Sequence, residues 1–165
     1  MVSQTRTNNP SRRSGRRCSS WLFAAVVAAA TSGVLFWFQQ SRQPDLQYLH
    51  DGLPIGKLGW VTVALVFPLA NAILEEFVFR WILFDGFRAC WGVVTAVAGT
   101  SVIFGLGHFG GYPPGAFGCA LAMVYGLSLA MLRLHSHGLI VPTVTHVLAD
   151  ATILVVLYRW SGSSA

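Results

Sequence analysis

The sequence predicts an all-α fold, a polytopic membrane helical bundle of about five transmembrane helices around a polar intramembrane cavity. Hydrophobic residues make up 54% of the 165 residues and charged residues only 10%, whereas an average soluble domain is about 25% charged. The apolar residues form uncharged runs that are long enough to cross a bilayer, and a few ionisable residues interrupt those runs. A soluble enzyme and a disordered chain are therefore excluded.

The N-terminal part divides into a polar tail and a first span. Residues 1–20 contain almost nothing to bury, so we expect a disordered basic cytoplasmic tail. Residues 21–38 are uncharged with a tryptophan near each end, which is typical of an anchor helix with interfacial aromatics. The small residues within this run would also suit a signal-peptide cleavage site, but the run continues past them, which favours an uncleaved anchor. Residues 39–57 predict a polar loop.

The positive charge of the chain is concentrated in the tail. Five of the eleven basic residues are arginines within the first 17 positions, so the net charge of +5 does not predict a nucleic-acid-binding face. Basic residues are enriched on the cytoplasmic side of membrane proteins. We therefore expect an integral protein of a prokaryotic plasma membrane, with a cytoplasmic N-terminus, the lipid bilayer around it and no nucleic-acid partner.

Four further apolar runs predict the other spans of a single transmembrane domain over 21–165, whose core covers 58–158. The runs cover residues 58–84, 89–107, 116–132 and 139–158. The first of them is interrupted by Glu75, Glu76 and Arg80. A charge at the bilayer centre costs about 2.5–3.5 kcal/mol on insertion scales. We therefore expect these charges to be paired or to face a polar cavity.

Three pairs of side chains share the spacing i,i+4, which places both members of a pair on one helix face. The pairs are Glu76 with Arg80, Phe104 with His108, and His146 with Asp150. Each pair alone has a structural explanation, because an ion pair can neutralise itself and a histidine at a helix end is usually only hydrogen-bonded. Together, in a chain so poor in charge, they favour one shared polar cavity.

These side chains can catalyse hydrolysis. A carboxylate and an imidazole beside one water can deprotonate it, and a second imidazole can stabilise the oxyanion of a tetrahedral intermediate. A zinc-dependent membrane protease is the alternative, because glutamate, histidine and aspartate all bind zinc, although the motifs HExxH and HxxEH are absent. The cysteines lack CxxC spacing and predict no thiolate site; they are Cys18, Cys90 and Cys119.

Three motifs carry a resemblance to a known family. The segment Glu75–Arg80 (EEFVFR) resembles EExxxR, Phe104–His108 resembles FxxxH, and His146–Asp150 resembles HxxxN. Their order and spacing resemble the CPBP family, which includes CAAX prenyl proteases, bacteriocin-processing and immunity proteins, and related glutamic intramembrane endopeptidases. The resemblance covers about residues 58–158.

The resemblance implies a role for each motif residue, and it implies neither a cofactor nor a metal. Glu75 would be the general base that activates water, assisted by His108. Glu76 and Arg80 would position the first helix of the core and tune Glu75, and Phe104 would support the site.

The third motif departs from the family pattern. His146 and residue 150 would form the oxyanion site, but Asp150 stands where many members have asparagine. A neutral amide can donate to an oxyanion, whereas an ionised aspartate would repel it. Either Asp150 is protonated, or it orients and charges His146, which then donates alone.

The resemblance implies a membrane-anchored protein or peptide as the substrate, cut near its anchor. With a cytoplasmic N-terminus the site would lie toward the outer face, which favours an exported protein with a C-terminal sorting tail over a prenylated CAAX end. A non-catalytic binding or immunity protein of the same family is the alternative. A small transporter is less well supported, because the chain lacks paired halves.

The depth of the motifs in the membrane raises a geometric difficulty. Glu75 and His108 lie at similar distances from an expected loop near residues 85–91, but straight helices would place His146 roughly 10–15 Å away from them in depth. We therefore expect that the connection at 133–138 is sunk into the protein, or that a helix is broken or steeply tilted.

Overall fold

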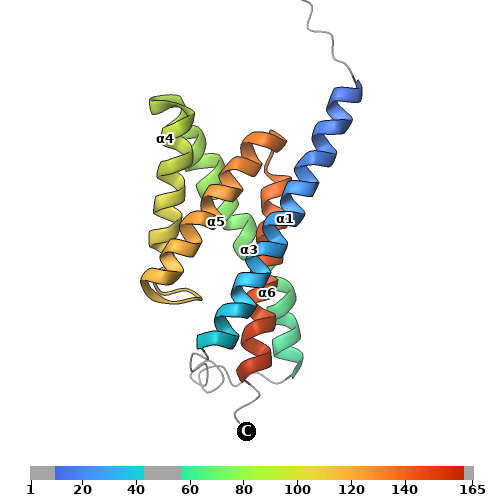
Figure 1. The fold of residues 1–165 in the computed structure, drawn as a ribbon, viewed down its shortest axis with the longest axis vertical. Coiled ribbons are helices and arrows are strands. Elements are labelled where there is room, and N and C mark those ends of the chain that lie inside the picture. The colour runs from blue at the N-terminus through green and yellow to red at the C-terminus, as the bar shows by residue number, and fades with distance from the viewer. Residues whose placement is uncertain (1–9, 43–56, 162–165) are drawn as a thin grey trace, which may run out of the picture.

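A computed structural model describes residues 10–42 and 57–161 of the chain. Both described ranges are helical and contain no strand, which confirms the predicted all-α fold. Figure 1 shows a bundle of long helices. They are α1 (Pro10–Arg42), α3 (Lys57–Glu76), the π-helix η1 (Phe77–Leu83), α4 (Phe84–Gly107), α5 (Gly115–Ser136) and α6 (Ile140–Ser161).

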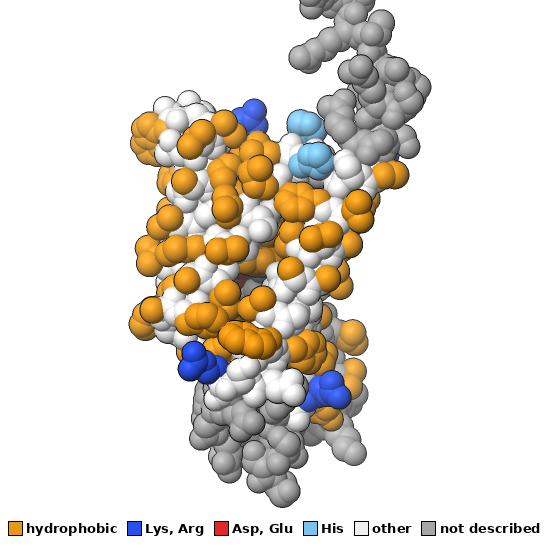
Figure 2. All heavy atoms as spheres, viewed as in Figure 1, with side chains coloured by type: hydrophobic (Ala, Val, Ile, Leu, Met, Phe, Trp, Pro, Cys, Tyr) orange, Lys and Arg blue, Asp and Glu red, His pale blue; other side chains and the backbone are white. Residues whose placement is uncertain are grey.

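Four helical stretches in the described ranges are long and apolar enough to cross a membrane, so the chain is an integral membrane protein. They are Arg17–Arg42, Val61–Gly107, Gly115–Ser136 and Ile140–Arg159. In the face shown in Figure 2, hydrophobic side chains cover the middle of the molecule, and Lys and Arg side chains lie toward its two ends. This distribution suits a molecule with a lipid-facing belt.

The sequence predicts about five spans, and the difference from four arises in the second stretch, which is 47 residues long. A straight helix of that length would measure about 70 Å, more than twice the thickness of the hydrocarbon core. Gly92 interrupts it with a φ of 85° and a ψ of 176°, a conformation that glycine adopts without a side-chain clash. Figure 1 shows the chain turning after η1 and α4 running back along the bundle.

The first helix is longer than the sequence predicts. α1 begins at Pro10, so residues 10–20 are helical where a disordered tail is expected. Proline is well suited to the first turn of a helix and arginine is a good helix former, so the helix of the apolar run continues through this segment. Residues 1–9 and 43–56, which include most of the expected polar loop, lie outside the described residues.

The packing of the helices brings the three motifs together. α6 contacts both α1 and α3, and α4 packs along α5. At Gly105 a side-chain Cβ would lie only 2.8 Å from the carbonyl oxygen of Cys119, so glycine allows α4 and α5 their close approach. α5 runs obliquely across the bundle in Figure 1. His146 contacts both Glu75 and Glu76, so the depth difference that straight helices imply is absent.

Candidate active site

The charged segment of the chain lies at the junction of α3 and η1. α3 ends at Glu76, and the wider turns of η1 begin at the next residue. π-Helical turns are rare in proteins, and many of those that occur lie at functional sites. Here the junction leaves Glu75 half-buried, while Glu76 and Arg80 are buried completely.

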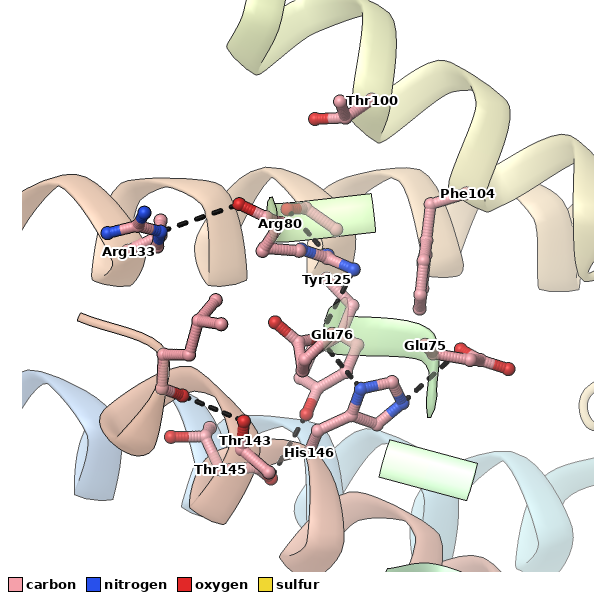
Figure 3. Close-up of polar contacts among 12 residues, drawn as sticks. Glu75, Glu76, Arg80, Thr100, Phe104, Tyr125, Arg133, Thr143, Thr145 and His146 are labelled. Atoms are coloured by element: carbon pink, nitrogen blue, oxygen red, sulfur yellow. Dashed lines mark hydrogen bonds and ion pairs between the residues drawn. The ribbon is translucent and has the colours of Figure 1, made fainter. Parts of the chain in front are cut away.

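Glu76 is the centre of a buried ion-pair network. Its Oε1 lies 3.2 Å from NH1 of Arg80, and the two side chains are 1% and 0% exposed. His146 Nδ1 donates a hydrogen bond of 2.9 Å to the same oxygen, and Figure 3 shows the His146 ring between the two neighbouring glutamates. Because a carboxylate only accepts, Nδ1 of His146 carries a proton and Nε2 faces the rest of the site.

Phe104 and Gly126 complete the surroundings of Arg80. Nη2 of Arg80 donates to the carbonyl oxygen of Gly126 at 3.1 Å, and the guanidinium carbon lies 4.5 Å from the centroid of the Phe104 ring. The same ring packs 4.3 Å from the His108 ring and 5.7 Å from the His146 ring, measured between centroids. Phe104 therefore contacts the cation and packs against both imidazoles.

Glu75 presents a carboxylate oxygen to both histidines. Its Oε2 lies 3.8 Å from Nε2 of His108 and 3.6 Å from Nε2 of His146. Both distances exceed a hydrogen bond, and no residue in the described ranges donates one to this oxygen. The side chains of Glu75 and His108 are 22% and 31% exposed. Glu75 therefore has an acceptor oxygen without a donor, beside two imidazoles.

His108 is oriented so that its Nε2 can accept a proton. Its Nδ1 lies 2.7 Å from the carbonyl oxygen of Phe104. A carbonyl oxygen only accepts, so Nδ1 donates, and in the neutral ring Nε2 keeps its lone pair. That lone pair lies on the side of Glu75, where it can take up a proton.

Asp150 joins the site through two partners. Its Oδ1 lies 3.7 Å from Nε2 of His146, and Nδ2 of Asn71 donates a 3.0 Å hydrogen bond to Oδ2. All the site residues predicted from the sequence therefore gather around one place in the bundle. Asn71 is not among the predicted residues, and its only signal is its position one helical turn before Glu75, on the same face of α3.

A comparison with protein families identifies the family of the chain. Residues 57–152 match a family model described as Type II CAAX prenyl endopeptidase Rce1-like. The match covers more than half of the chain.

The chain belongs to this Rce1-like family. The predicted resemblance to CAAX proteases is thereby confirmed, and membership implies a peptidase that acts on protein or peptide substrates. No curated protein and no solved structure matches the chain.

In this Rce1-like protein the site opens onto an apolar cavity of about 270 Å³. His108, His146 and Asp150 are among the residues that line it. Part of the lining also comes from α1, which precedes the matched region, through Val26, Val27, Ala30, Thr31, Val34 and Leu35. A helix outside the family match therefore completes the space beside the motif residues.

α1 also contacts the loop that follows His108 and the start of α5. The Tyr112 hydroxyl donates to Oε1 of Gln39, whose side chain is buried, and the Phe38 ring stacks on Phe117 with centroids 5.3 Å apart. Burial raises the pKa of Tyr112 to about 12, so the hydroxyl stays protonated and keeps donating well above neutral pH.

No group of three or more His, Cys, Asp or Glu side chains within residues 10–42 and 57–161 is arranged to hold a metal ion. The acidic and imidazole groups of the Rce1-like site instead contact one another, Arg80 and Asn71. Their arrangement suits proton transfer between carboxylates and imidazoles.

Proposed function

We propose that the chain is an intramembrane glutamic endopeptidase that hydrolyses a peptide bond near the membrane anchor of a partner protein. The observation that carries this proposal is the position of Glu75 Oε2, which faces Nε2 of both His108 and His146 without a hydrogen-bond donor among the described residues. A carboxylate and a neutral imidazole in this arrangement can share the proton of a water molecule.

In the proposed reaction Glu75, assisted by His108, removes a proton from water as its oxygen attacks the peptide carbonyl carbon. The electron pair of the carbonyl double bond moves to oxygen, and His146 together with position 150 stabilises the resulting oxyanion. When the C–N bond breaks, the proton held by Glu75 and His108 passes to the leaving nitrogen. The products are a carboxylic acid and an amine.

Glu76, Arg80 and Phe104 support this chemistry without touching the substrate. The carboxylate of Glu76 holds the Nδ1–H of His146, so the imidazolium form of the ring donates to the oxyanion from Nε2. Arg80 balances the charge of Glu76, and Phe104 packs against both imidazoles. Fixed donors of this kind stabilise a developing charge without having to reorganise during the reaction.

We also propose that the chain crosses a prokaryotic plasma membrane five times as a single transmembrane domain over residues 21–165, with its N-terminus in the cytoplasm. The break at Gly92 and the reversal of α4 support two crossings within the stretch of 47 residues. The arginines of the N-terminal tail support the orientation.

The substrate is a protein with an apolar anchor. The cavity beside His108 and His146 is lined mainly by apolar side chains, which suits an apolar segment of the substrate. Two kinds of end are candidates: a C-terminal sorting tail with an apolar span and basic residues, or the prenylated CAAX end that the family description names.

Cleavage by the detergent-purified full chain tests the proposal. The probes are a prenylated CAAX peptide and a peptide with an apolar span followed by basic residues. We expect one of them to be cut equally well with and without a metal chelator, and we expect His108→Ala and His146→Ala to reduce the rate by about 10²-fold or more. Mass spectrometry of the products measures the cleavage.

Other results would favour the alternatives. Loss of cleavage in chelator and its recovery with zinc would indicate a zinc-dependent membrane protease. Binding of a peptide by wild type and variants alike, with no cleavage by any of them, would indicate a non-catalytic member of the family.

The wall of the cavity offers a second test. Ala30 of α1 lines the cavity, so Ala30→Phe should fill part of it and lower kcat/KM for the cleaved peptide by about tenfold. Ala29 is exposed and is not one of the described residues that line the cavity, so Ala29→Phe adds the same bulk as a matched control. Equal rates for the two variants would show that the substrate does not enter this cavity.

A further inference from the structure

Position 150 poses an electrostatic problem in this chain. It holds an acid where the motif HxxxN has an amide. Three carboxyl groups therefore meet around His146, from Glu75, Glu76 and Asp150, and Arg80 is in contact with one of them. Three ionised carboxylates so close together in a largely buried site would repel one another and any oxyanion.

The contacts of His146 show where a proton is needed. Its Nδ1 already donates to Glu76. Its Nε2 faces Oε2 of Glu75 at 3.6 Å and Oδ1 of Asp150 at 3.7 Å. Three atoms with lone pairs do not face one another stably without a hydrogen between them. At least one proton therefore resides in this triangle.

Asn71 determines which oxygen of Asp150 can carry that proton. Its Nδ2 donates to Oδ2 at 3.0 Å, so Oδ2 acts as the acceptor oxygen of the carboxyl group. A proton on Asp150 then sits on Oδ1, the oxygen that faces His146. The protonated group presents an O–H donor where asparagine would present an N–H.

We propose that Asn71 is a positioning residue that orients Asp150 so that its neutral carboxyl group donates from Oδ1, and that the pair thereby replaces the single asparagine of HxxxN. Asp150 lines the cavity together with His146, so the O–H on Oδ1 lies where it can donate to the oxyanion, and Nε2 of His146 donates as well when the ring carries its second proton. Asn71 acts through Asp150. This inference rests on the proposed hydrolysis of a peptide bond.

A double-mutant cycle with the full chain in detergent tests the pair. The probe is the prenylated CAAX peptide or the apolar-span peptide, whichever the wild type cuts. With Asp at position 150, we expect Asn71→Ala to lower kcat about tenfold with little change in KM. With Asn at that position, we expect the same substitution to lower kcat by only about twofold, because an amide carries its N–H donors at every pH.

A second comparison covers the case in which Asn71→Ala does not fold. Asn71→Asp places two carboxyl groups against each other and should lower kcat. Adding Asp150→Asn exchanges the two residues, keeps the net charge of the wild type and should raise kcat again. A merely structural contact would not produce this rescue together with an unchanged KM.

Three results would overturn the inference. They are an equal effect of Asn71→Ala in both backgrounds, no rescue by the exchange, and complete inactivity of Asp150→Asn. Glu75→Gln is included to separate the two proposals. If that variant cleaves as fast as wild type, or wild type does not cleave at all, the proposed function fails and the inference fails with it.

Discussion

Replacing Glu75 by glutamine is expected to lower the rate of peptide cleavage by about 10²–10⁴-fold, the usual contribution of a general base. Glutamine keeps the shape of the side chain but cannot take a proton from water. Because Glu75 is half-buried and its Oε2 receives no hydrogen bond from the described residues, the substitution should leave the stability nearly unchanged. Single-turnover cleavage assays and thermal unfolding in detergent measure the two effects.

The neighbouring glutamate is the matched control. Glu76 is buried against Arg80 and His146, so Glu76→Gln leaves a buried guanidinium without its counter-charge and should lower the unfolding temperature. Glu75 should therefore be needed for chemistry alone, whereas Glu76 should be needed for stability as well as for holding His146. A Glu75→Gln enzyme that keeps more than about a tenth of the wild-type rate would contradict its role as the base.

The second large effect is expected at Arg80. Arg80→Met should lower the free energy of unfolding by about 3–5 kcal/mol, the cost of removing one partner from a buried ion pair. The guanidinium is fully buried, contacts Glu76 and donates to the carbonyl of Gly126. Denaturant unfolding in detergent, followed by tryptophan fluorescence, measures the change.

Arg133 provides the comparison for this effect. Its contact with Asp85 is 3.4 Å long, and the two side chains are 21% and 42% exposed, so Arg133→Met should cost only about 0–1 kcal/mol. Combining Arg80→Met with Glu76→Gln removes both charges and should recover part of the lost stability. If Arg80→Met were no worse than Arg133→Met, the buried network would not contribute to the fold.

The fold class and the membership of the site could be predicted because their signals are local. Apolar runs of membrane-spanning length indicate helices wherever they occur. The spacing i,i+4 places Glu76 with Arg80 and His146 with Asp150 before any tertiary contact is known. The catalytic roles stay predictions, because the positions of these side chains are compatible with binding as well as with chemistry.

Other features have no local signal. The hydrogen bond from Asn71 joins residues 79 positions apart, and nothing near Asn71 in the sequence indicates its partner. The wall that α1 adds to the cavity depends on how that helix packs against α5 and α6. Tertiary packing also decides whether the helix breaks at Gly92, because a single glycine is tolerated within a helix as well as at a break.

The long-range contact between Glu76 and His146 has a consequence for biogenesis. The two residues are 70 positions apart, and the ribosome releases α3 well before α6. During that interval Glu76 has Arg80 from the next turn as a partner, but it has no donor from α6. We therefore expect α3, whose charges are costly in lipid, to integrate stably only when α6 arrives, so that insertion of this bundle finishes as a concerted step rather than helix by helix.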